Sequence, residues 1–249
     1  MKAIFKGIDL SKHNGKVDFQ KVKDTGVDFV ILRAGFGKTI AQKDKMFEEY
    51  YAGAKKVGLG VGAYWFTYAT NPATAAVEAR VCAEAIKGKQ FEFPIYYDLE
   101  DDPNSKSYPL STGIKNCSEM VKAFCNELEA NEYWAGFYAS RSVIQTLITP
   151  EVAKRYAVWV AEWGSTCRYS GNYGMWQYSE TGRIDGISGN VDLDLCYMDY
   201  PMAIKRLKLN GFAEEYRVII EPFTTKENAE KFLASISDKY PKSRIEKIR

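Results

Sequence analysis

The chain has 249 residues, of which 46% are hydrophobic and 27% charged, a composition typical of one large globular domain with or without a small appendage. Its 34 basic and 32 acidic residues leave a net charge of +2 with no basic stripe, so there is no electrostatic footprint for nucleic acid. No apolar segment is long enough to cross a bilayer, and we expect no membrane partner. The aromatic share of 14% suits a surface that stacks on sugar rings or nucleobases, although a Tyr-rich core is the alternative.

The first residues of the chain, the cysteines and the single histidine exclude several further kinds of site. The apolar run after Lys2 stops after three residues without a cleavage site, which predicts synthesis in the cytoplasm without a signal peptide. The five cysteines are widely scattered without CxxC spacing, and His13 is the single histidine. These counts argue against a disulfide framework, a zinc site and a Ser-His-Asp triad. We therefore expect neither a metal nor a cofactor.

The hydrophobic pattern predicts strands and helices in alternation. Expected strands cover residues 2–10, 27–35, 59–66, 91–99, 133–138, 157–161, 174–178 and 189–194. Expected helices between them cover residues 18–24, 45–57, 73–86, 114–129 and 149–155. Strand then helix, repeated with short connectors, predicts a parallel sheet.

The positions of four acids favour one arrangement of that sheet. Eight strands suit a closed (β/α) barrel, although a doubly wound sheet shows the same alternation. Asp9, Asp98, Glu100 and Asp192 all fall at the carboxyl ends of expected strands. A barrel brings the first, fourth and last strand ends around one mouth. We therefore predict an α/β protein with a TIM-like (β/α) barrel, regular or irregular, as a catalytic domain over residues 1–200.

The remaining residues have a different pattern. Residues 201–213 are expected to be a linker, with Asn210-Gly211 as its boundary signal. A strand at 215–221, an amphipathic helix at 225–236 with Thr225 as N-cap and a strand at 243–248 would form a strand-helix-strand appendage over residues 214–249. Such a piece buries too little core to fold alone, so it either packs on the barrel or pairs with a second copy as a homo-oligomer.

The end of the fourth expected strand carries the strongest chemical signal. Alternation along a strand points Asp98 and Glu100 to the same side. Like charges this close raise one pKa, which costs stability unless a proton-transfer reaction uses it. The alternative is that the acids simply open a polar loop. One protonated and one ionised carboxyl group are the equipment for glycoside hydrolysis, without a metal or a histidine base.

Aromatic side chains gather at the same expected strand ends. Each of them singly fits a core or rim contact equally well, but together they favour a carbohydrate groove. The residues are Tyr64, Phe66, Tyr97, Tyr138, Trp159, Trp163 and Trp176.

Several sequence blocks recur in a recognisable order. They are residues 7–11 (GIDLS), 13–15 (HNG), 17–19 (VDF), 29–34 (FVILRA), 62–66 (GAYWF), 97–100 (YDLE), 176–178 (WQY) and 186–194 (GISGNVDLD). The series resembles that of glycoside hydrolase family 25, the lysozymes of phages and bacteria that cut peptidoglycan between N-acetylmuramic acid and N-acetylglucosamine. The Asp-x-Glu pair alone is weakly specific, whereas the ordered series is highly specific.

The resemblance implies roles for individual residues. It makes Glu100 the general acid, Asp98 its partner, and Asp9 and Asp192 further members of an acidic cluster. Singly, Asp192 fits a turn and Asp9 an Asx turn. Asp98 could be a nucleophile, serve an inverting water, or orient the substrate's own 2-acetamido group; we favour the last, because of the i, i+2 spacing and the N-acetylated substrate.

The resemblance extends to substrate contacts and to the appendage. Arg33 and Gln177, which lie in matching blocks, join the aromatic residues as expected substrate-binding residues. The expected partner is bacterial peptidoglycan, reached after release by a holin or by lysis. The tail resembles half of a sporulation-related repeat, a wall-binding module. The alternatives are a chitinase-like hydrolase of N-acetylglucosamine polymers and a non-catalytic wall-binding protein on the same barrel.

Overall fold

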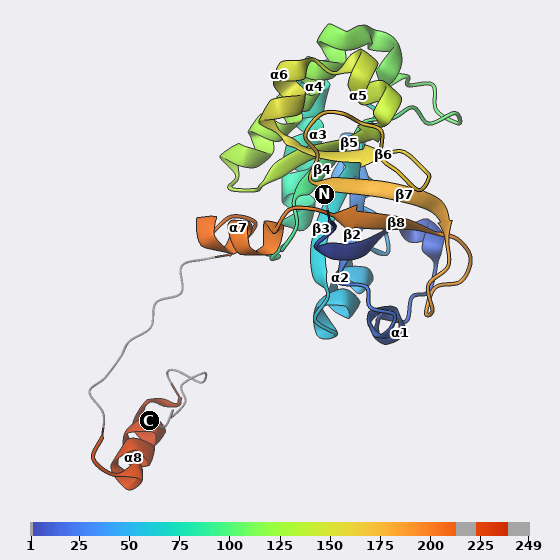
Figure 1. The fold of residues 1–249 in the computed structure, drawn as a ribbon. Helices are drawn as coiled ribbons and strands as arrows, with labels where there is room; N and C mark the ends of the chain where they lie inside the picture. The colour runs from blue at the N-terminus through green and yellow to red at the C-terminus, as the bar shows by residue number, and fades with distance from the viewer. Residues whose placement is uncertain (1, 213–222, 239–249) are drawn as a thin grey trace. The chain divides into compact units, whose positions relative to one another are not determined.

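The computed structural model describes residues 2–212 and 223–238, and the chain divides into a larger unit, Met1–Ala213, and a smaller one, Glu214–Arg249. The larger unit is a closed barrel whose eight strands follow one another in sequence order (Figure 1). The strands are β1 (Phe5–Leu10), β2 (Phe29–Phe36), β3 (Gly60–Phe66), β4 (Ile95–Asp98), β5 (Ala135–Ser140), β6 (Ala157–Ala161), β7 (Met175–Gly182) and β8 (Val191–Cys196). The α-helices of this unit are α1 (Phe19–Asp24), α2 (Phe47–Lys56), α3 (Pro72–Ile86), α4 (Gly113–Ala130), α5 (Arg141–Leu147), α6 (Pro150–Arg155) and α7 (Tyr200–Leu207).

The predicted (β/α) barrel is confirmed, but the expectation of a fully parallel sheet is wrong at β8. Strands β1 to β7 pair in parallel, whereas β8 runs antiparallel to both β7 and β1. A parallel crossover needs a dozen or more residues, and only residues 183–190 connect β7 to β8, so the two strands can join only antiparallel. Asp192 therefore lies near the amino end of β8 and not at a carboxyl end. The reversed direction nevertheless brings it beside Asp9 of β1, its register partner.

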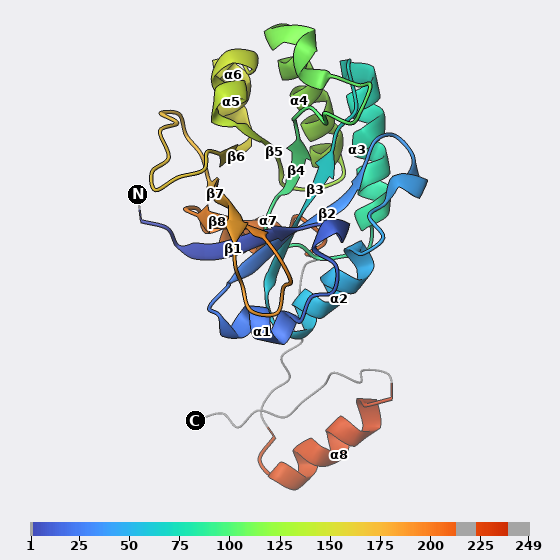
Figure 2. The same cartoon turned by 90° about the vertical axis from the view of Figure 1, so that its right-hand side faces the viewer.

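The β7–β8 connection is held against the first helix. An isolated bridge joins Val17 to Ile187, and the Asp18 backbone N–H donates to the Gly186 carbonyl at 2.9 Å. Figures 1 and 2 both show this connection beside α1. Gly186 has φ 95°, and a Cβ there would lie 2.5 Å from the Asp18 oxygen, so both the conformation and the close approach require glycine. These contacts fix the segment that leads into Asp192.

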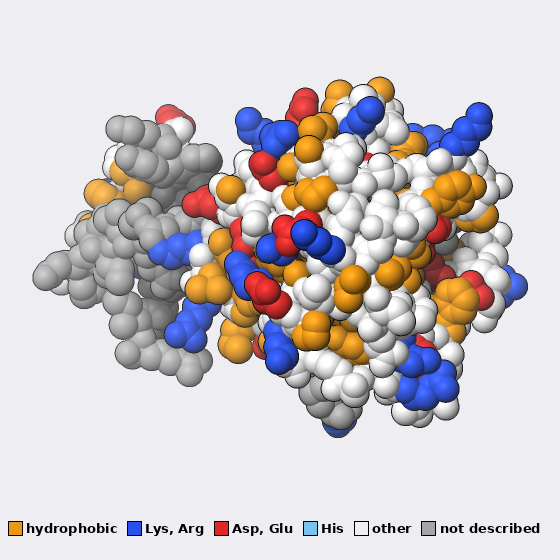
Figure 3. All heavy atoms as spheres, turned by 90° about the horizontal axis from the view of Figure 1, so that it is seen from above, with side chains coloured by type: hydrophobic (Ala, Val, Ile, Leu, Met, Phe, Trp, Pro, Cys, Tyr) orange, Lys and Arg blue, Asp and Glu red, His pale blue; other side chains and the backbone are white. Residues whose placement is uncertain are grey.

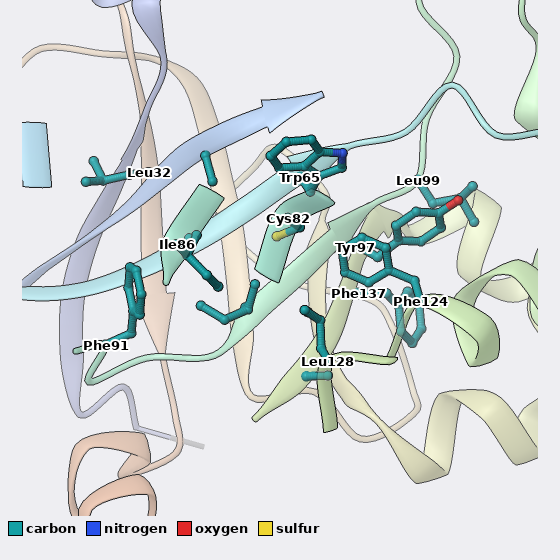
Figure 4. Close-up of a cluster of buried hydrophobic side chains, with 14 of the residues drawn as sticks. Leu32, Trp65, Cys82, Ile86, Phe91, Tyr97, Leu99, Phe124, Leu128 and Phe137 are labelled. Atoms are coloured by element: carbon teal, nitrogen blue, oxygen red, sulfur yellow. The ribbon is translucent and has the colours of Figure 1, made fainter. Parts of the chain in front are cut away.

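The largest part of the core lies between the barrel and its outer helices. Figure 4 shows Trp65 of β3 and Tyr97 of β4 on the helix side of the strands, near Cys82 of α3 and Phe124 and Leu128 of α4. All five side chains are buried, and the rings of Tyr97 and Phe124 stand 4.5 Å apart. This layer buries every second residue of β3 and β4 on the outside and leaves the alternate residues to face the barrel interior.

Two local differences from the sequence prediction have physical reasons. Strand β4 is shorter than expected and begins only after Pro94, which has no N–H to give to a ladder. Helix α5 was not predicted. Its apolar signal is short, but Ser140 caps it by accepting from the Val143 N–H at 3.3 Å.

The expected linker over residues 201–213 is wrong for its described part. Tyr200 and Ile204 of α7 are buried against the barrel. Asn210 is fully buried: its Oδ1 accepts from the Trp134 N–H at 2.6 Å, and its Nδ2 donates to the Phe91 and Phe93 carbonyls at 3.1 and 2.9 Å. The side-chain amide of Asn210 thus satisfies backbone groups in the segments that lead into β4 and β5, because one amide offers both N–H donors and an oxygen acceptor.

The described part of the smaller unit, residues 223–238, contains helix α8 (Lys226–Ile236). The predicted N-cap is confirmed, because Thr225 Oγ1 accepts from the Asn228 N–H at 3.2 Å. The predicted strands at 215–221 and 243–248 lie outside the described residues. Across all described residues, no helix combines the length and apolar character needed to cross a membrane. Acidic and basic side chains are interspersed on the face drawn in Figure 3, in keeping with the small net charge.

Candidate active site

A pocket of about 90 Å³ lies at the mouth of the barrel, where β1, β4 and β8 present their acids. It brings together all four acids that the sequence singled out, with four of the expected substrate-binding residues. The lining residues are Asp9, Tyr64, Asp98, Glu100, Tyr138, Trp159, Gln177 and Asp192.

Asp98 and Glu100 both line this pocket, as strand alternation predicted. Asp98 ends β4 and is 5% exposed, and Glu100 follows in the adjoining loop, partly buried. Burial first, and then the charge of Asp192, raises the pKa of Glu100 to about 7. Burial and the charge of Glu100 also raise the pKa of Asp98, against which the Arg33 guanidinium acts. Glu100 can therefore still hold its proton near neutral pH.

Asp98 has an unusual hydrogen-bonding state. Its Oδ1 is buried and accepts no hydrogen bond from any residue in the described part of the chain. A buried carboxylate oxygen without a donor costs of the order of 1–3 kcal/mol, so it is expected only where something else supplies the donor. The oxygen beside Glu100 is thus free to accept an N–H from a bound molecule.

A second group of acids, Asp9, Asp192 and Asp194, lies where β1 pairs with β8. Burial and the charges of Asp194 and Asp192 raise the pKa of Asp9, and a hydrogen bond from Gln177 opposes the rise. Burial raises the pKa of Asp192 to about 6. Asp194 is 1% exposed and is held by Trp159, whose Nε1–H donates to its Oδ1 at 2.9 Å. The mouth therefore contains more carboxyl groups than can all ionise at neutral pH.

Gln177 fixes the geometry of one wall. Its Nε2 donates to Asp9 Oδ2 at 2.8 Å, which assigns its Oε1 as an acceptor for two donors. These are the Tyr138 hydroxyl at 3.0 Å and the Trp163 Nε1–H at 3.1 Å. Trp163 is 55% exposed and stands at the rim, whereas Trp159 forms the floor. The Gln177 amide thus links the exposed Trp163 ring to the buried Asp9, and these hydrogen bonds hold this side of the pocket in a fixed arrangement.

Two of the predicted substrate-binding aromatics are wrong. Tyr97 faces the outer helices, where its hydroxyl lies 2.7 Å from Thr67 Oγ1. Trp176 also lies on the outer side of its strand, with its Nε1–H bonded to the Glu162 carbonyl at 2.7 Å. Each is a direct strand neighbour of a pocket residue, Asp98 or Gln177, so the pleat turns it to the opposite face.

The remaining expected residues lie near the pocket without lining it. Phe66 stands at the end of β3 with its ring 5.2 Å from that of Tyr68. Arg33 forms an ion pair with the buried Asp44 at 2.7 Å. It does not line the pocket, but its positive charge lowers the pKa of Asp98. The sequence prediction missed Asp194. The signal was present, because Asp192 and Asp194 alternate along a strand as Asp98 and Glu100 do.

The acids do not form a metal-binding arrangement. Within residues 2–212 and 223–238, no three His, Cys, Asp or Glu side chains are placed to hold a metal ion.

Fold and site together define the class of protein. Paired carboxyl groups of unequal pKa, set among tyrosine and tryptophan side chains at the mouth of a (β/α) barrel, are the arrangement of a glycoside hydrolase. Residues 8–187 match the model of the glycosyl hydrolases family 25, and the chain belongs to this family.

Known relatives agree with this assignment. The chain is similar to the autolytic lysozyme of Clostridium acetobutylicum, with 31% identity over 190 residues that cover 76% of this chain and 55% of the relative. It is also similar to lysozyme M1 of Streptomyces globisporus, with 28% identity over 207 residues, 75% of this chain and 65% of the relative. The chain thus spans between about half and two thirds of the length of these relatives.

Solved structures share the fold. The bacterial lysozyme from Streptomyces coelicolor superposes with a TM-score of 0.69 at 25% identity, covering 84% of this chain and 98% of that one. The modular autolysin LytC from Streptococcus pneumoniae, solved with a synthetic peptidoglycan ligand, gives a TM-score of 0.70 at 30% identity, covering 78% of this chain and 46% of that one.

Proposed function

We propose that the protein is an N-acetylmuramidase that hydrolyses the β-1,4 bond between N-acetylmuramic acid and N-acetylglucosamine in bacterial peptidoglycan. One observation carries the proposal: a carboxyl group that keeps its proton near neutral pH, Glu100, lies beside Asp98, a buried carboxylate with an oxygen lacking a donor. Family membership and the lysozymes among the relatives support the choice of substrate.

In this proposal Glu100 is the general acid. It gives its proton to the glycosidic oxygen as the bond from that oxygen to C1 of the muramic acid breaks, which neutralises the leaving alkoxide. The raised pKa serves this step, because an ordinary glutamate would already have lost its proton at pH 6 to 7.

Asp98 acts on the substrate's 2-acetamido group. Its unpartnered Oδ1 accepts the acetamido N–H, and the acetamido oxygen then attacks C1 from the opposite face. Water opens the resulting ring with Glu100 as base, so the product keeps the original anomeric configuration. Asp192, whose pKa of about 6 leaves it ionised at neutral pH, lies beside Asp9 in the pocket and stabilises the positive charge that develops on the sugar.

Two measurements test the proposal. Mass spectrometry of digested, purified peptidoglycan should find fragments with muramic acid at the reducing end; fragments ending only in N-acetylglucosamine, or turnover of chitin oligomers alone, would refute the assignment. NMR of early product should show the retained anomer first, and the inverted anomer would exclude the acetamido route.

A further inference from the structure

A second and larger cavity, about 340 Å³, opens on the barrel beside the acidic pocket. It lies between the loop after β2, the loop after β3 and the first turns of α3. Lys38, Gln42, Tyr68, Thr70, Thr74 and Glu78 are among its lining residues. It shares no lining residue with the acidic pocket, and the reaction proposed above uses none of these side chains.

Tyr68 connects the two regions. Its hydroxyl donates to Asp102 Oδ2 at 2.9 Å, in the loop that begins with Glu100. Its ring packs against Phe66, the register partner of Asp98. The cavity therefore lies alongside the chain segment that carries the candidate acid, on the side of β3.

The wall of the cavity is rigid because Glu78 anchors it. This carboxyl group is 1% exposed and accepts from Thr67 Oγ1 at 2.6 Å and from the Tyr68 N–H at 3.0 Å. Both donors belong to the loop after β3, so a buried hydrogen-bonded group holds the loop, and Tyr68 with it, in place. The cavity is thus preformed.

The cavity contains donors that the protein does not use. Gln42 Oε1 is occupied by the Thr39 N–H and hydroxyl, which leaves its Nε2 to donate elsewhere. In the part of the chain that the structure describes, the Lys38 ammonium makes no salt bridge, although its charge opposes the rise that burial causes in the pKa of Glu78, and the hydroxyls of Thr70 and Thr74 make no hydrogen bond. Thr74 stands in the first turn of the 15-residue helix α3, where its backbone N–H is capped by Asn71 Oδ1 at 2.9 Å, so only its hydroxyl faces a ligand. Such a set selects a ligand rich in carbonyl and carboxylate oxygens.

We propose that this cavity is a second substrate site, which binds the carboxylate-bearing peptide that branches from muramic acid. The inference rests on the proposed function, because the glycan in the acidic pocket is what brings the branch to Tyr68. Lys38 pairs with a peptide carboxylate, Gln42 and the threonine hydroxyls donate to peptide carbonyls, and the Tyr68 ring packs on the aliphatic part.

Lys38→Glu tests the site, with Lys87→Glu as the matched control, because Lys87 is an exposed lysine at the C-terminal end of α3, away from the cavity at its first turns. Each variant is assayed on intact peptidoglycan and on glycan stripped of peptides by an amidase. Lys38→Glu should lower kcat/KM at least about fivefold on the peptide-bearing substrate and leave the stripped glycan unaffected. Equal losses on both substrates, or no difference from the control, would overturn the site.

A peptide-binding experiment tests this inference independently of the proposed function. A synthetic tetrapeptide, L-Ala-γ-D-Glu-L-Lys-D-Ala, is titrated into the full chain and followed by NMR. The wild type should bind it and Lys38→Glu should bind it at least about fivefold more weakly. Failure of the wild type to cleave either glycan would refute the muramidase assignment while this titration still decides the site; absence of peptide binding would refute the site even in an active muramidase.

Discussion

Glu100→Gln is the substitution that tests the proposed chemistry most directly. The amide matches the carboxyl group in shape but has no proton to give to a leaving oxygen. General acid catalysis contributes about 10²–10⁴-fold, or about 3 to 5 kcal/mol of activation free energy, so clearing of a turbid wall suspension should fall by at least about a hundredfold. Sedimentation with cell walls should persist, because the rings and the other acids of the pocket remain.

The wild-type pH profile should carry the same signature. Because the pKa of Glu100 is raised from 4.5 to about 7, the acid form dominates below pH 7 and falls to about one tenth at pH 8. Activity should therefore decline as pH rises through 7. Between pH 4.5 and about 7 the folded state binds more protons at Glu100 than the unfolded state does, so this group makes stability fall as the pH rises through that window, by at most about 3 kcal/mol.

The stability effect provides an internal control. Glu100→Gln removes the pH-dependent penalty, so the variant should melt at a higher temperature than the wild type at pH 8 and at a similar temperature at pH 4. Glu84→Gln, at an exposed position of α3, should change neither activity nor melting. A folded Glu100→Gln protein that clears walls at more than about one tenth of the wild-type rate would refute Glu100 as the acid.

Three further substitutions separate the roles of neighbouring residues. Asp98→Asn should lower kcat by about a hundredfold or more, since the neutral amide can still accept the acetamido N–H but cannot stabilise the positive charge that develops on this group as its oxygen attacks C1; near-normal kcat with the retained anomer would contradict the orienting role. Asp194→Asn keeps the acceptor for Trp159 but removes a buried charge whose pKa is raised by burial, so the melting temperature should rise at pH 8 and stay unchanged at pH 4; a lower melting temperature at pH 8 would show that the charge is needed. Tyr97→Phe should keep full activity and lose about 1 kcal/mol in denaturant unfolding, because its hydroxyl contacts only Thr67 on the outer face, and a tenfold drop in kcat/KM would restore it to the site.

Much of the barrel could be predicted from periodicity because its strands are buried on both faces and its helices have one apolar side. The direction of β8 was not predicted, although the connection over residues 183–190 is too short for a crossover helix. The expected linker was also wrong, because an Asn-Gly pair is read locally as a turn, whereas Asn210 is defined by the backbone groups of distant strands that it satisfies.

The candidate site was predicted well where the pleat was taken into account and badly where it was not. Alternation correctly placed Asp98 with Glu100, and the same rule would have excluded Tyr97 and added Asp194. The hydrogen-bond network around Gln177 could not be predicted. It joins side chains from β1, β5 and β7, whose distances from one another depend on the tilt and stagger of the strands in the closed barrel.

The antiparallel seam between β1 and β8 means that the acidic pocket is split between the two ends of the barrel's sequence. Asp9 arrives with the first strand and Asp192 with the last, and they become neighbours only when the barrel closes. When only the first seven strands have formed, the core is nearly complete, but the acidic pocket still lacks Asp192. Hydrolytic activity should therefore appear only when β8 pairs with β1. The rate at which activity recovers during refolding would then report the rate of this last long-range pairing.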